Sequence, residues 1–167
     1  EPWINPFIDV KESDWFYSAV EFVNRNGFYM GTGANTFTPN GAMTRAMFWT
    51  VLGRVNGQTL SGSGVYDAAR GWAMSAGITD GTSPYGDISR EQIVTIIWRY
   101  AGSPKSDGEL SAFSDADNVS DYAFDAMVWA VENGIILGNN GRLMPRDNAT
   151  RVQAAAIIQR FIEATMK

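Results

Sequence analysis

The stretch Pro39–Val55, P-N-G-A-M-T-R-A-M-F-W-T-V-L-G-R-V, returns twice along this chain in altered form. The second copy is Pro84–Tyr100, P-Y-G-D-I-S-R-E-Q-I-V-T-I-I-W-R-Y, and the third is Pro145–Phe161, P-R-D-N-A-T-R-V-Q-A-A-A-I-I-Q-R-F. In every copy a hydroxyl residue and an arginine stand five and six positions after the proline, and a second arginine follows nine positions later. Self-similarity at a long period is typical of repeat proteins, in which each repeat supplies one supersecondary unit. The sequence therefore predicts three repeated units.

Apolar residues recur at helical spacing after each of these arginines and again earlier in each unit. Helices are therefore predicted over about 15–26, 44–55, 66–76, 89–101, 121–133 and 150–164. Ser13-Asp14 and Asp121 are the predicted starts of the first and fifth helices, because Ser and Asp favour the N-cap position. Gly27 and Gly134 are the predicted ends of these two helices, since glycine is favoured just beyond a helix C-terminus.

Polar linkers at 56–64 and 102–111 separate the units, with predicted bounds of 1–57, 64–102 (a shortened copy) and 112–167. No segment shows the alternation of a strand, so the predicted fold is all-α, with three helix-loop-helix repeats in one compact domain. Trp49, Trp98 and Trp129 lie at helical spacing and are predicted to pack in the core. The repeats leave no room for a separate catalytic domain.

The composition excludes several classes of function. The net charge of -5 disfavours nucleic acid as a partner, because phosphate binding requires a basic face. The absence of histidine and cysteine removes the commonest general base, the usual zinc ligands and thiolate chemistry. No apolar run approaches the roughly 20 residues of a membrane span, so membrane insertion is not expected. We expect neither an enzyme nor a bound cofactor or metal.

The hydroxyl residue of each copy stands where a helix N-cap is expected, directly before an apolar-periodic run. These residues are Thr44, Ser89 and Thr150. Glutamine follows Ser89 and Thr150 at the third position, which predicts capping boxes there, whereas methionine follows Thr44.

The arginine after each cap is harder to explain by helix formation. Arg45, Arg90 and Arg151 occupy the first helical position, where the macrodipole disfavours a cation by about 0.3–1 kcal/mol. A local rule broken in all three units indicates another role. Free N–H groups at a helix N-terminus attract anions, and a guanidinium adds a bidentate receptor for a carboxylate or phosphate. The alternative is an internal ion pair with Asp9, Asp115 or another repeat's carboxylate, and the sequence leaves both open.

These patterns resemble the S-layer homology (SLH) family, whose units read approximately F-x-D-V…W-A-x-x-A-I…G-I-I-x-G…G-x-F-x-P…I-T-R-A-E. The first unit matches at Phe7-Ile8-Asp9-Val10, Trp15, Ala19-Val20, Gly27, Gly31, Phe37, Pro39 and Met43-Thr44-Arg45-Ala46. The third matches at Phe113-Ser114-Asp115-Ala116, Tyr122, Ala126-Met127, Gly134-Ile135-Ile136, Gly138, Leu143, Pro145 and Thr150-Arg151. The second keeps Ala69, Gly77-Ile78, Gly81, Pro84 and Ile88-Ser89-Arg90. The resemblance covers essentially the whole chain.

The resemblance implies a pseudo-threefold helical bundle with grooves between adjacent units. It implies a non-catalytic, extracellular module of the bacterial cell surface. The implied ligand is an acidic, pyruvylated secondary cell wall polysaccharide on peptidoglycan, and the implied setting is a larger surface protein or an S-layer. The implied site residues are Arg45, Arg90 and Arg151 as anion contacts, Asp9 and Asp115 as partners of sugar hydroxyls or supports for an arginine, Trp15 and Tyr122 as ring faces, and the hydroxyls of Thr44, Ser89 and Thr150.

The second unit departs most from the family pattern. It lacks F-x-D-V, and Val65 stands at the tryptophan position, so one or two competent grooves are expected and Arg90 is expected to matter less for binding. An alternative is a protein-interaction or S-layer assembly module whose degenerate repeats have lost glycan binding. A carboxylate-based glycosidase and a calcium site at Asp115–Asp121 are both disfavoured, the latter because the glycine and terminal glutamate of an EF-hand loop are missing.

Overall fold

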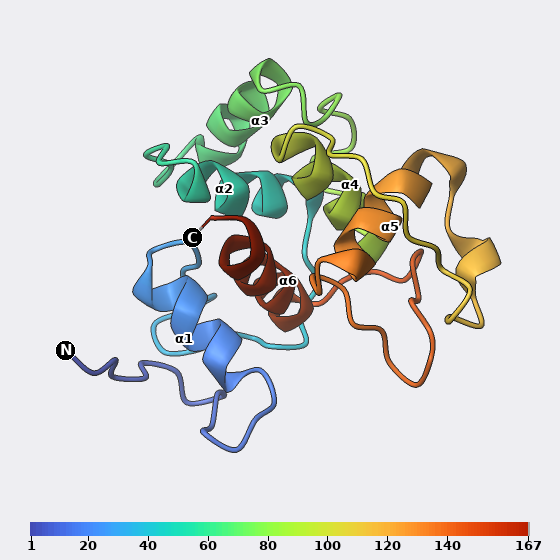
Figure 1. Ribbon diagram of the computed structural model, residues 1–167. Helices are drawn as coiled ribbons and strands as arrows, with labels where there is room; N and C mark the ends of the chain where they lie inside the picture. The colour runs from blue at the N-terminus through green and yellow to red at the C-terminus, as the bar shows by residue number, and fades with distance from the viewer. Residues whose placement is uncertain (167) are drawn as a thin grey trace.

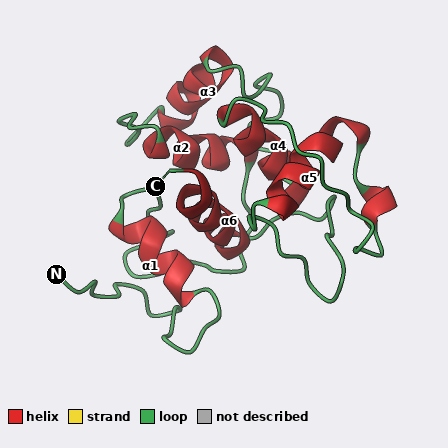
Figure 2. Ribbon diagram, viewed as in Figure 1, coloured by secondary structure: helices red, strands yellow, loops and turns green. Residues whose placement is uncertain are grey.

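The computed structural model describes residues 1–166, and its regular elements are helices (Figures 1 and 2). The α-helices are α1 (Tyr17–Arg25), α2 (Arg45–Val55), α3 (Val65–Ser75), α4 (Arg90–Tyr100), α5 (Phe124–Glu132) and α6 (Arg151–Thr165). Two 3₁₀ turns, Ala116–Asn118 and Asp121–Ala123, precede α5. Extended pairing within these residues is limited to isolated bridges. The predicted all-α class and its six helices are confirmed; the last residue of the third predicted unit, Lys167, lies outside the described part.

Two of the predicted helix starts are wrong. Asp14 does not cap α1; its Oδ2 accepts the Lys11 N–H at 2.8 Å and closes a separate turn, and α1 begins after Phe16 without a side-chain cap. Asp121 opens a 3₁₀ turn rather than the α-helix itself. Such turns are common at helix N-termini, and this one delays α5 to Phe124.

Each unit's first helix packs against the second helix of the preceding unit. The packed pairs are α1 with α6, α3 with α2, and α5 with α4. Figure 1 accordingly shows α2, α4 and α6 in the middle of the molecule and α1, α3 and α5 outside them. Packing between helices therefore crosses the sequence repeats, and the pair α1·α6 joins the first unit to the last.

The N-termini of α2, α4 and α6 meet in a cyclic arrangement that makes the bundle pseudo-threefold. Isolated bridges join Thr44 to Asp87, Ser89 to Asn148 and Thr150 to Ala42. The first backbone N–H of each helix, on Arg45, Arg90 and Arg151, donates to the carbonyl of Gly86, Asp147 and Gly41 at 2.9, 3.0 and 3.0 Å. The second N–H donates to the carbonyl of Pro84, Pro145 and Pro39 at 2.9, 2.8 and 3.1 Å.

The side-chain caps complete this junction. The hydroxyls of Thr44, Ser89 and Thr150 accept the third N–H of their helices at 3.1, 3.2 and 3.2 Å, and capping boxes form at the second and third of them. The predicted caps are therefore confirmed. The expectation of free N–H groups for an anion is wrong, because the first three donors of each helix already have protein partners.

The core is formed largely by apolar faces of the six helices. Trp49 and Trp129 are buried as predicted, and Trp98 is partly buried against the core. None of the helices within residues 1–166 is long and apolar enough to cross a membrane. The cyclic packing leaves three hollows between neighbouring units, and these hold the arginines.

Candidate functional site

Three grooves, one per pair of neighbouring units, contain the repeated arginines. Groove A holds Arg45, Arg99, Asp80 and Tyr122; groove B holds Arg90, Arg160, Leu137 and Trp15; groove C holds Arg151, Arg54, Met30 and Tyr66. In each groove the first arginine comes from one unit, the second arginine and the loop residue come from the next unit, and the aromatic residue comes from the remaining unit. Every groove is therefore a composite of all three units.

Helix geometry explains why one helix lines two grooves. The two arginines of each repeat are nine positions apart, which is about two and a half turns of an α-helix. They therefore project from opposite sides, so that Arg45 and Arg54 of α2 line groove A and groove C respectively. The second arginines are functional candidates that our sequence reasoning left out of the site, although their spacing was visible in the repeat.

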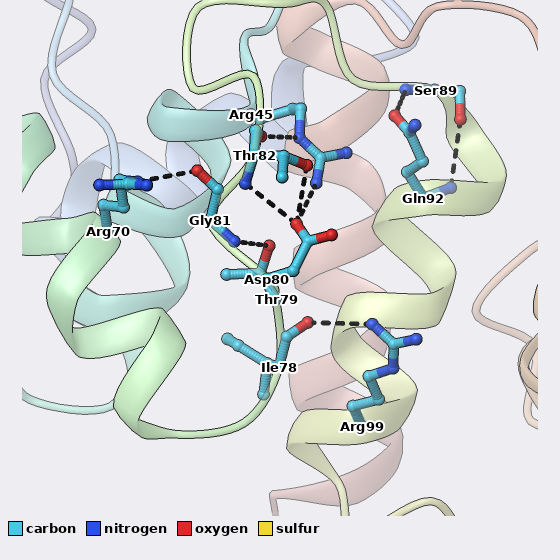
Figure 3. Close-up of polar contacts among 10 residues, drawn as sticks. All are labelled: Arg45, Arg70, Ile78, Thr79, Asp80, Gly81, Thr82, Ser89, Gln92 and Arg99. Atoms are coloured by element: carbon cyan, nitrogen blue, oxygen red, sulfur yellow. Dashed lines mark hydrogen bonds and ion pairs between the residues drawn. The ribbon is translucent and has the colours of Figure 1, made fainter.

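Groove A has a volume of about 390 Å³ and is polar (Figure 3). The Nε of Arg45 donates to the Thr82 carbonyl at 2.9 Å, and one Nη lies 3.8 Å from Oδ1 of Asp80. On the facing helix, Arg99 donates to the Ile78 carbonyl at 3.4 Å (Figure 3). One guanidinium edge of Arg45 thus faces the neighbouring unit, with its Nε bonded to a carbonyl and the adjacent Nη near a carboxylate.

Asp80 is held in place by its own loop. Its Oδ1 accepts the Thr82 N–H at 3.0 Å and the Thr82 hydroxyl at 2.8 Å. The backbone hydrogen bond, the hydroxyl and nearby Arg45 lower the pKa of Asp80, so it is ionised at neutral pH. The alternative of an ion pair between repeats is therefore realised at Arg45.

The far wall of groove A presents a half-exposed ring. Tyr122 is 52% exposed, and its hydroxyl lies 3.5 Å from Oε1 of Glu91. Glu91 is buried and accepts the N–H and hydroxyl of Ser120 at 2.9 and 2.7 Å. This carboxylate therefore fastens the 3₁₀ turn that carries Tyr122 onto α4.

Groove B, of about 420 Å³, combines cations with an apolar wall. Arg90 donates its Nε to the Leu143 carbonyl at 3.0 Å, and burial together with the charge of Arg160 lowers its pKa from the ordinary value. The indole of Trp15 is 65% exposed, and the side chain of Leu137 is 61% exposed. No carboxylate is among the described residues that line this groove.

Groove C is small, about 140 Å³, and its arginine is committed to the protein. Arg151 is only 6% exposed, and donates to the Phe37 and Met30 carbonyls at 2.8 and 3.0 Å. Its guanidinium stacks over the rings of Phe37 and Tyr29, 4.9 and 5.4 Å from their centroids. Arg151 is thus held by two backbone carbonyls along one guanidinium edge and by contact with two neighbouring aromatic rings.

The two aspartates line none of the grooves. Asp9 accepts the N–H groups of Phe37 and Thr38, both at 2.8 Å. Asp115 accepts those of Leu143 and Met144, both at 2.8 Å. The Phe37 and Leu143 carbonyls are the ones that receive Arg151 and Arg90, so each aspartate fixes the peptide that orients an arginine.

Arg151 is enclosed in groove C, and the other predicted site residues fall into two groups. Arg45, Arg90, Trp15 and Tyr122 line the two larger grooves, A and B. The aspartates orient arginines from behind, and the three hydroxyls act as helix caps outside the grooves. The groove of Arg90 does not depend on the second unit alone, because Arg90 shares it with Trp15 of the first unit and the loop of the third.

Comparison with known proteins shows the family to which the chain belongs. The S-layer homology domain profile matches residues 6–46 and 112–155, which together make just over half of the chain. The chain belongs to the S-layer homology domain family. S-layer homology domains are non-catalytic anchoring modules of the bacterial cell surface, and the expected location there is confirmed.

Individual relatives share the same region. An endoglucanase of Bacillus sp. (strain KSM-635) is 29% identical over 94% of this chain and 19% of its own length. An amylopullulanase of Thermoanaerobacterium thermosulfurigenes is 30% identical over 94% of this chain and 9% of its own. The surface-layer 125 kDa protein of Lysinibacillus sphaericus is 27% identical over 94% of this chain and 10% of its own. The S-layer homology chain thus spans less than a fifth of each of these relatives.

Proposed function

We propose that this S-layer homology chain anchors its protein to the cell wall by binding, in groove B, an acidic secondary cell wall polysaccharide that is attached to the peptidoglycan. The observation that supports this proposal is the meeting of two guanidiniums and an exposed indole in a groove without a carboxylate among its described lining residues. A pair of arginines favours an anion, and an exposed aromatic face favours the apolar face of a sugar ring.

The lining of groove B suits a pyruvate ketal in particular. Such a group carries a carboxylate and a methyl group on one carbon. The carboxylate would meet Arg90 and Arg160, and the methyl group would meet the apolar wall at Leu137 and Ile157. Within residues 1–166, Arg90 donates a hydrogen bond only from its Nε, so both of its Nη groups are available for a bidentate contact.

The relatives extend the proposal from the module to a protein. Two of them are named as polysaccharide-degrading enzymes and one as a surface-layer protein, and each is far longer than this chain. We therefore propose that the chain is the wall-binding part of a larger surface protein, with any catalytic or structural activity encoded elsewhere.

Sedimentation with purified wall sacculi tests the proposal. The chain is expected to sediment with intact sacculi and to stay in solution after acid removes the attached polysaccharide. Arg90→Ala is expected to weaken binding about 10- to 100-fold, because a hydrogen bond between charged groups contributes about 1.5–3 kcal/mol. Arg25→Ala is the matched control, since it removes the same charge from an exposed site outside the three grooves.

Two results would contradict the proposal. No binding to intact sacculi would remove the anchoring role. Binding that survives removal of the polysaccharide would favour the alternative, a module that contacts protein or bare peptidoglycan.

A further inference from the structure

We propose that the two larger grooves, A and B, have different ligands: groove A binds a neutral, hydroxyl-rich sugar residue, and Asp80 is the residue that excludes an acidic sugar there. This inference rests on the proposed function, because it assigns the acidic sugar to groove B. The two grooves cannot be distinguished by their arginines, since each of them holds two.

The difference arises at one loop position. The third residue after the glycine that follows each unit's first helix is Met30, Asp80 or Leu137. In groove B this position presents the exposed, uncharged side chain of Leu137. In groove A it presents a carboxylate 3.8 Å from Arg45, the arginine that corresponds to Arg90.

A carboxylate at that position occupies the place where the carboxylate of a ligand would meet the arginine. The Asp80 side chain is 71% exposed, and its Oδ1 is held in this position by the N–H and the hydroxyl of Thr82. An acidic sugar in groove A would therefore have to compete with a fixed, ionised side chain for Arg45, and would be repelled by it. Groove B imposes no such competition from its described lining residues.

The same carboxylate improves groove A for a neutral sugar. Oδ2 of Asp80 makes no hydrogen bond within residues 1–166, so it is available to accept from a sugar hydroxyl. Gln92 also lines groove A, and its carboxamide oxygen accepts the Ser89 N–H at 2.9 Å (Figure 3), while its NH₂ group makes no hydrogen bond within residues 1–166 and is available as a donor. Sugar hydroxyls both donate and accept, and the half-exposed ring of Tyr122 adds a stacking face.

The test counts binding sites for an acidic probe. Isothermal titration is performed with the methyl glycoside of an N-acetylhexosamine that carries a 4,6-pyruvate ketal. We expect one site per chain for the wild type, none for Arg90→Ala, and two for Asp80→Asn. The double variant Arg90→Ala/Asp80→Asn is expected to keep one site, now in groove A. Asp107→Asn makes the same charge change in an exposed linker and is expected to keep one site.

A second titration uses the same glycoside without the ketal. Asp80→Asn is expected to weaken its binding at least about threefold, with Asp107→Asn unchanged. Asp80→Leu, which copies the residue of groove B, is expected to gain the acidic site and to lose the neutral one. Asparagine keeps the oxygen that Thr82 requires, so Asp80→Asn is the variant that also preserves the loop.

The outcomes separate this inference from the proposed function. If the wild type sediments with sacculi and binds the acidic glycoside at one site, but Asp80→Asn gains no second site, the assignment of Asp80 is wrong and the anchoring role stands. If Arg90→Ala still binds the acidic glycoside at one site, that glycoside binds outside groove B and the assignment of ligands to the two grooves is wrong. If the wild type binds neither sacculi nor glycoside, both proposals fail.

Discussion

The arginine at the first helical position joins two roles in one side chain. In all three units its Nε donates to a carbonyl of the neighbouring unit, that of Thr82, Leu143 or Phe37. This bond compensates for the unfavourable position of the cation beside the helix dipole. The units differ in the Nη groups of this arginine. Those of Arg90 are available in a groove, whereas Arg151 donates from one Nη to the Met30 carbonyl and lies against two aromatic rings.

This difference predicts opposite effects of two equivalent substitutions. Arg151→Ala is expected to lower the free energy of unfolding by about 2–4 kcal/mol, because it leaves buried carbonyls and stacked rings without their partner. Arg90→Ala is expected to lower it less and to weaken sacculus binding more. Urea denaturation followed by tryptophan fluorescence measures the first effect. Arg151→Ala with an unchanged midpoint and lost binding would show instead that groove C takes the ligand.

At the scale of the element, a carboxylate clamp determines the shape of the loop before the second helix in two of the three units. Asp9 and Asp115 each accept two consecutive backbone N–H groups of that loop. The second unit has no such aspartate, and its shorter loop is shaped by Asp80 and Thr82 instead. Losing F-x-D-V thus changed how the loop is held, not whether Arg45 receives a carbonyl.

The clamp predicts a dependence of stability on pH. Burial alone would raise the pKa of Asp115, but the N–H groups of Leu143 and Met144 bring it below the ordinary value of 3.8. A carboxyl with a depressed pKa stabilises the fold above its unfolded pKa, and this contribution is lost as pH falls through the folded pKa. Asp115→Asn is therefore expected to be less stable than the wild type at pH 7.

The gap in unfolding free energy between Asp115→Asn and the wild type is expected to narrow as the pH falls below about 4, where the carboxyl of the unfolded chain gains its proton, and to close once the pH passes the lower pKa of the folded carboxyl. Urea titrations at several pH values measure it. Asp107→Asn, in the exposed linker, should show no comparable gap. A gap that is constant from pH 7 to pH 2 would mean that Asp115 acts by shape and not by charge.

The sequence predicted an element well where the residues that determine it are neighbours in the sequence, and poorly where they are far apart. The starts of α2, α4 and α6 were predicted because a cap and an apolar period lie next to each other in the sequence. The start of α1 was not predicted correctly, because the carboxylate of Asp14 accepts the Lys11 N–H instead of capping the helix. Which residues share a groove was beyond sequence reasoning, since Arg90 and Trp15 line the same groove only through the packing of α1 on α6.

At the scale of the molecule, the closed ring of helix pairs makes the units depend on one another. In the first unit, α1 packs on α6 and α2 packs on α3, so neither helix has its main partner inside residues 1–57. The leading N–H groups of α2 also need carbonyls from the second unit, at Gly86 and Pro84. A single unit therefore lacks both its core and part of its hydrogen bonding.

A fragment of residues 1–57 is accordingly expected to be unfolded in water. Its helices have 9 and 11 residues, and isolated helices shorter than about 12–15 residues are marginal. Far-ultraviolet circular dichroism of the fragment should show little helix, while the full chain should unfold cooperatively. A fragment with its own sharp thermal transition would contradict the pairing of helices between units.

The composite grooves also bear on how such a chain can evolve. Tandem duplication copies a unit, but each groove is assembled from parts of all three units. The second unit supplies Asp80 to groove A, Arg90 to groove B and Tyr66 to groove C. Mutations in one duplicate therefore alter every groove at once, each at a different place. Three copies that began alike can in this way give rise to three sites with different chemistry, even while most of the divergence is confined to a single copy.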